Sequence, residues 1–126
     1  MKVADYLERP YPQPPCWYLV MDVLREQCGF AAADHTPEAD GKIAIAHAFR
    51  VALHEGGLKG FRKVAAPADF TVVFMARRPG GTPLHCGVWY QGKVLHAMRR
   101  MVVWEPLFSL GDRYAHFEYW MHDGHH

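Results

Sequence analysis

The spacing of hydrophobic residues changes about halfway along the chain. Between residues 17 and 28, Trp17, Val20 and Leu24 recur at helical intervals, and Gly29 follows as a helix stop. A second helix is predicted after Thr36-Pro37-Glu38, which combine a cap residue, a first-turn proline and an acid. The later segments are rich in β-branched and aromatic residues separated by Pro, Gly and Asp, and they predict strands at 61–64, 70–76, 84–90, 93–97, 101–105 and 113–121.

This order of elements predicts the fold class. Helices followed by strands indicate an α+β domain in which N-terminal helices pack on an antiparallel sheet. Residues 6–15 contain Pro10, Pro12, Pro14 and Pro15, so we expect this segment to be extended and to lead directly into the helix that starts at Cys16. Neither a repeat nor a linker divides the sequence, so we expect one domain over residues 1–126.

Composition and charge narrow the range of partners. Half of the residues are hydrophobic, which is enough for a packed core, and the formal net charge of +1 argues against nucleic acid as a partner. The basic pairs Arg62-Lys63, Arg77-Arg78 and Arg99-Arg100 lie at predicted strand or loop edges, so we interpret them as solvated edges.

The N-terminus and the cysteines give an expectation about location. Met1-Lys2 is followed by acids and prolines, so no signal peptide is expected, and the longest apolar stretch, residues 17–21, is too short to cross a membrane. Synthesis in the cytoplasm is therefore expected. The three cysteines are an odd number, and in a reducing compartment they favour free thiols over disulfides.

A predicted hairpin brings two histidines together. Gln91-Gly92 suits a two-residue turn that pairs Tyr90 with Lys93, and this register places Gly87 opposite His96. His85 and His96 then share one face of the sheet, and Gly87 leaves space for an imidazole. Cys86 is expected to point to the opposite face.

Cys16, His85 and His96 together predict a cysteine nucleophile. The N–H groups at a helix start favour a thiolate, an imidazole favours it further, and a second imidazole can orient the first. Cys28 and Cys86 are interpreted as core thiols. Cys16, His85 and His96 are also residue types that bind zinc, but the sequence contains no Cys-x-x-Cys pair, and we expect no metal.

Three segments resemble the NlpC-type branch of the papain-like cysteine peptidases. They are Cys16-Trp17-Tyr18-Leu19-Val20, Pro67-Ala68-Asp69-Phe70-Thr71-Val72-Val73-Phe74, and the hairpin from His85-Cys86-Gly87-Val88-Trp89-Tyr90 to Val94-Leu95-His96-Ala97. The stretch from Val94 to Leu107 is particularly similar to tail-assembly members from phages and prophages, and the resemblance covers residues 11 to 107. The chain departs from the family at Pro15, where an acid is usual, and at Trp17-Tyr18, where small residues are usual.

The resemblance implies a papain-like domain that hydrolyses amide bonds of peptidoglycan stem peptides, typically the bond between D-glutamate and diaminopimelate. Cys16 would be the nucleophile, His85 the base and then the acid, and His96 the orienting residue. Tyr11 and Trp17 are candidates for contacts to the oxyanion or the substrate, and no cofactor is needed. The implied partners are the cell-wall peptide and phage tail proteins, and the implied location is a phage tail or virion.

Two alternatives stay open at the level of sequence. One is a tail-assembly protein that keeps the fold without useful turnover. The other is an acyl-transfer enzyme or toxin that uses the same three residues on a different amide.

Overall fold

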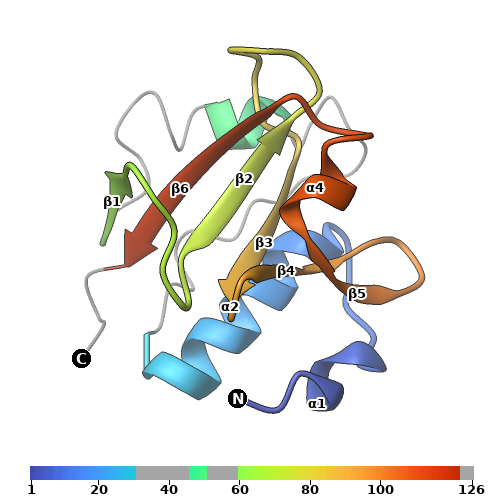
Figure 1. Cartoon of the computed structure of the whole chain (residues 1–126). Coiled ribbons are helices and arrows are strands. Elements are labelled where there is room, and N and C mark those ends of the chain that lie inside the picture. Colours follow the sequence, from blue (N-terminus) through green and yellow to red (C-terminus); the bar gives the residue numbers. More distant parts are fainter. Residues whose placement is uncertain (31–45, 51–59, 123–126) are drawn as a thin grey trace.

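A six-stranded antiparallel sheet forms the centre of the molecule (Figure 1). The structure is a computed structural model that describes residues 1–30, 46–50 and 60–122. Its strand order is β1-β6-β2-β3-β4-β5. The bounds are β1 Phe61–Val64, β2 Val72–Ala76, β3 His85–Tyr90, β4 Lys93–Ala97, β5 Val102–Pro106 and β6 His116–His122. The α+β class and the antiparallel sheet predicted from the sequence are confirmed.

The long helix α2, Pro15–Cys28, covers one face of this sheet (Figure 1). It contacts β3 and β4, and its Leu19, Val20 and Val23 are fully buried. The helix begins at Pro15, one residue before the predicted start at Cys16, because a proline suits the first helical turn, where no intrahelical N–H bond is lost. It ends as predicted at Gly29, which adopts a left-handed φ of 66°.

The two faces of the sheet are buried by different elements. Val72, Phe74 and Leu95 point toward α2, whereas Val73, Met75 and Val94 point to the opposite face, as strand alternation requires. That second face is covered by the short helix α4, Leu107–Leu110, and by Tyr114 beyond it. No helix in the described parts of the chain is long and apolar enough to span a bilayer.

The first half of the chain differs from prediction near its N-terminus and lies partly outside the described residues. The segment 6–15 is not wholly extended, because Tyr6 and Leu7 end a short helix, α1, Ala4–Leu7, before the first of the four prolines. The predicted second helix falls mostly on residues 31–45 and 51–59, outside the described part; residues 46–50 are helical.

Strand starts differ from prediction where local backbone geometry intervenes. β2 begins at Val72 and not at residue 70, because Phe70 has a φ of 70° that is incompatible with a strand. β6 begins at His116 and not at residue 113, because the chain after α4 continues as a hydrogen-bonded turn in which the Tyr114 N–H donates to the Leu110 carbonyl.

The predicted β3–β4 hairpin is confirmed. Tyr90 pairs with Lys93, and both turn residues have positive φ, 47° at Gln91 and 80° at Gly92. This is the combination that a two-residue turn with the twist of its strands requires. The register of the two histidines follows from it.

Gly87 makes room for this arrangement. A Cβ atom at position 87 would lie 2.7 Å from the Leu95 carbonyl oxygen and 2.9 Å from the His96 Cβ. Because both neighbours belong to the paired strand, we expect Gly87→Ala to lower the free energy of unfolding by about 1 to 3 kcal/mol. Denaturant titration measures this, with Gly111→Ala as the control, since its new Cβ would meet nothing closer than 3.3 Å. Equal stability of the two variants would contradict the prediction.

Candidate active site

His85 and His96 form a direct hydrogen bond between buried imidazoles. The His85 Nε2 lies 2.8 Å from the His96 Nδ1, and the rings meet edge to face with centroids 5.0 Å apart. His85 is the first residue of β3 and His96 lies on the neighbouring strand β4, on the face that the hairpin register predicted. The expected pairing of the two histidines is confirmed.

Glu105 extends this pair to a third side chain. The His96 Nε2 lies 2.7 Å from the Glu105 Oε2, and the Arg113 Nη2 donates to both oxygens of the same carboxylate at 3.0 Å. Burial and the nearby charge of His85 lower the pKa of His96 to about 4, although Glu105 opposes the shift. His96 is therefore neutral at pH 7, and its Nε2–H donates to the carboxylate.

This network fixes the tautomers. A neutral His96 that donates through Nε2 has its lone pair on Nδ1, so His85 must donate its Nε2–H there. The Nδ1 of His85 is then the nitrogen left for the thiol. Tyr114 stacks on the His85 ring with centroids 5.7 Å apart and planes only 8° apart, which holds the imidazole in one orientation.

Cys16 is the second residue of α2 and is only 3% exposed. Its pKa lies well below the ordinary thiol value because the Cys86 side chain and the His85 imidazole both hydrogen-bond to the thiolate. The charge of His85 and the backbone N–H of Cys86 add to this, and together they outweigh the burial of the sulfur. The structure thus brings Cys16, His85 and His96 together.

Cys86 is a member of the site that sequence reasoning missed. We expected it to lie on the sheet face away from His85 as an ordinary core thiol. It does lie on the α2 face, but Cys16 is on that face too, and both cysteines belong to one buried cluster. Burial and the neighbouring Cys16 raise the pKa of Cys86, so it stays protonated and donates to the Cys16 thiolate.

The other two candidates occupy different positions. The Tyr11 hydroxyl donates to the Asp22 Oδ2 at 2.7 Å. Asp22 follows Cys16 by six residues on α2, which is roughly 9 Å along the helix axis. The Trp17 ring packs against Phe49 and Phe74 in the core and is 1% exposed. Neither side chain donates to the thiol; Tyr11 instead lines a hollow beside the site.

That hollow has a volume of about 240 Å³. Its walls are the chain from Leu7 to Tyr11 on one side and the turn from Ala97 to Val102 on the other. Pro15, which precedes the nucleophile, and Ala97, which follows His96, also line it. Two residues of its lining are therefore the sequence neighbours of Cys16 and His96.

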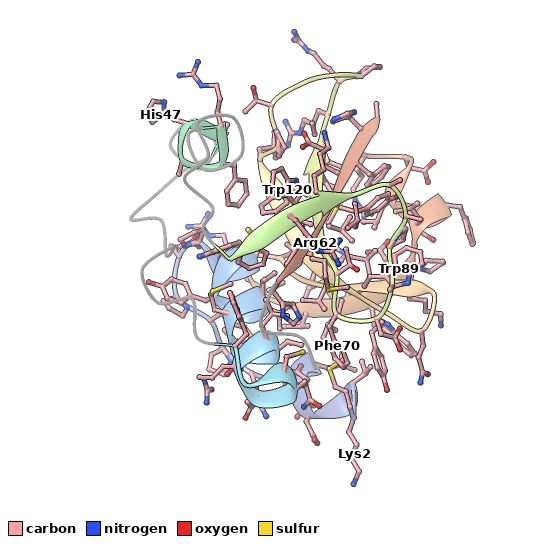
Figure 2. All side chains as sticks on the ribbon, turned by 90° about the vertical axis from the view of Figure 1, so that its left-hand side faces the viewer. Lys2, His47, Arg62, Phe70, Trp89 and Trp120 are labelled. Atoms are coloured by element: carbon pink, nitrogen blue, oxygen red, sulfur yellow. The ribbon has the colours of Figure 1, made fainter. Side chains whose placement is uncertain are left out.

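The histidines outside this site do not form a metal centre within the described ranges. No group of three or more His, Cys, Asp or Glu side chains there is arranged to hold a metal ion. Figure 2 shows His47 on the helical turn at 46–50, where its side chain is exposed. His122 is buried and lies against the rings of Phe30 and Phe61.

The lowered pKa of Cys16 predicts selective alkylation. As the pH falls, Cys28, whose pKa is raised by burial, loses its thiolate before Cys16, whose pKa is lowered. With iodoacetamide, we expect Cys16 to be modified first at pH 6 and Cys86 last, as measured by peptide mass spectrometry. Equal rates at all three cysteines would show that Cys16 is an ordinary thiol.

No family model, curated protein or solved structure matches the chain in comparisons with known proteins. The interpretation of the site therefore depends on its own geometry and on the motifs in the sequence.

Proposed function

We propose that the protein is a papain-like, NlpC-type cysteine peptidase that hydrolyses amide bonds in peptidoglycan stem peptides. The observation that carries the proposal is the placement of Cys16, at the start of α2, beside His85, which hydrogen-bonds to His96. Nucleophile, base and orienting group are the parts that covalent amide hydrolysis requires. The motif resemblance supplies the substrate class, and it also suggests a role in a phage or prophage tail.

The first chemical step forms a thioester. The Cys16 thiolate attacks the amide carbonyl carbon, and the carbonyl oxygen becomes an oxyanion. Pro15 has no N–H, so the backbone N–H of Cys16 is the first donor that α2 offers to this oxygen. When the intermediate collapses, the C–N bond breaks and the His85 imidazolium gives its Nδ1 proton to the leaving amine.

The second step releases the acid. Neutral His85 removes a proton from water, the resulting hydroxide attacks the thioester carbonyl, and the C–S bond breaks. The products are a carboxylic acid and the Cys16 thiolate, which again faces a protonated His85. His96 accepts the Nε2–H of His85 throughout, so the ring does not rotate away between the two steps.

One structural observation favours a second candidate function. Cys16 is 3% exposed and His85 is 8% exposed, which is tight for a site that must admit a peptide. A tail-assembly protein that keeps this fold without turnover would tolerate such burial.

Digestion of purified peptidoglycan distinguishes the two functions. Incubation with the protein, followed by mass analysis of the soluble fragments, is expected to show new amine and carboxylate ends at one stem-peptide bond, and Cys16→Ala is the control. Identical fragments from the protein and the control would overturn the proposal in favour of an assembly role. Transfer of the acyl group to an added amine instead of water would identify an acyl-transfer enzyme.

A further inference from the structure

The hollow beside the active site is lined by more positive than negative charge. Arg99 and Arg100 lie at the exposed turn between β4 and β5, and Glu8 and Arg9 face them from the N-terminal segment. Arg9 is already bound to Asp22 at 2.9 Å and to Glu26, which fixes that wall against α2. The described residues offer no ion-pair partner to Arg99 or Arg100.

The position of these two arginines relates them to the reaction. The turn that carries them starts directly after Ala97, whose side chain lies in the same buried cluster as Cys16. On the other wall, Pro15 adjoins Cys16 itself. The hollow is therefore lined by the sequence neighbours of Cys16 and His96, and a peptide bound in it would lie beside Arg99 and Arg100.

We infer that this hollow is a substrate subsite that recognises a carboxylate of the peptide next to the cleaved amide. The inference rests on the proposed function. Guanidinium groups are planar donors that bind carboxylates through two parallel hydrogen bonds. Two unpaired guanidiniums against the single carboxylate of Glu8 leave the hollow a net attraction for an anionic group.

The chain permits a matched test of this subsite. Two forms of a synthetic stem peptide are compared, one with the free α-carboxylate of its glutamyl residue and one with that group converted to a carboxamide. We expect the protein to cleave the carboxylate form with a kcat/KM about 2- to 5-fold higher, mainly through KM, as for one partly exposed charged pair.

Replacement of the two arginines is expected to abolish this preference. Arg99→Gln/Arg100→Gln cleaves both forms at the rate of the carboxamide, whereas Arg62→Gln/Arg78→Gln, which removes two exposed arginines that do not line the hollow, keeps the preference. Figure 2 shows Arg62 on β1, at the edge of the sheet opposite β5. Equal cleavage of the two peptides by the unmodified protein, or a preference that survives in Arg99→Gln/Arg100→Gln, overturns the subsite.

Failure of the proposed function gives a different result. If neither peptide is cleaved, calorimetric titration of the unmodified protein with the carboxylate peptide decides the inference separately. Binding that weakens about 2- to 5-fold in Arg99→Gln/Arg100→Gln, and not in the control, supports an anion-binding hollow without peptidase activity. Absence of binding overturns the subsite as well.

Discussion

Replacement of either Cys16 or His85 by alanine is expected to lower kcat on a peptidoglycan peptide by about ten-thousand-fold or more. Without the sulfur no thioester forms, and without the imidazole the thiol loses a hydrogen bond and a charge that keep its pKa low. The two groups act as one unit, so the double variant is expected to be no worse than either single variant. Release of the new amino group measures the rate.

Cys28→Ala is the matched control for this prediction. Cys28 is the last residue of the same helix, is half-buried and has a raised pKa, so its loss should leave kcat unchanged. Far-ultraviolet circular dichroism of each variant separates loss of chemistry from loss of fold. Turnover by Cys16→Ala at the rate of Cys28→Ala would assign the hydrolysis to another group.

The sequence was sufficient for the parts of the site that depend on local geometry. A two-residue turn at Gln91-Gly92 admits only one register, and that register places Gly87 beside His96 and thereby His85 beside His96. The placement of Cys16 in the first turn of α2 was equally local, because prolines precede it and apolar residues follow at helical spacing. Both expectations needed no knowledge of the rest of the chain.

Glu105 and Cys86 could not be assigned because they depend on tertiary contacts. The β4–β5 connection sets the register that pairs Val94 with Glu105, and only this register brings the carboxylate to the face of His96. The alternation of β5 could have placed Glu105 on the face of His96 once the register was known. However, the turn from Met98 to Met101 has no glycine or asparagine to mark its length, so the sequence left the register open. The contact between Cys86 and Cys16 could not be predicted without knowing the sheet face on which α2 packs.

The order of the charges explains why this relay favours a thiolate. A neutral His96 stands between His85 and the Glu105 carboxylate, so the negative charge acts on His85 through one intervening ring. Arg113 holds both carboxylate oxygens, and together with His96 it outweighs burial and lowers the pKa of Glu105. Glu105 therefore stays charged at pH 7.

Removal of the orienting ring is expected to reduce activity strongly without abolishing it. In His96→Ala, the His85 Nε2–H loses its acceptor, and we expect kcat to fall about 100-fold, because the imidazole still meets the thiol but is no longer held in one tautomer. His96→Asn places an amide oxygen near the position of Nδ1, where it accepts the same hydrogen bond. It should recover about tenfold of the loss, and His96→Gln less, since its amide lies one carbon further out.

Glu105→Gln tests the electrostatic part of the relay. The amide oxygen still accepts from the His96 Nε2–H, so the packing is kept, but the negative charge that stabilises the His85 imidazolium is gone. We expect kcat at pH 7 to fall about tenfold or less, because the imidazolium that forms during the reaction is then stabilised less. Glu105→Ala should lower kcat further, because it also removes the acceptor of the His96 Nε2–H bond. Unchanged kcat in both Glu105 variants and in His96→Ala would mean that His96 and Glu105 take no part in the reaction, and the third member of the catalytic site would have to be another side chain.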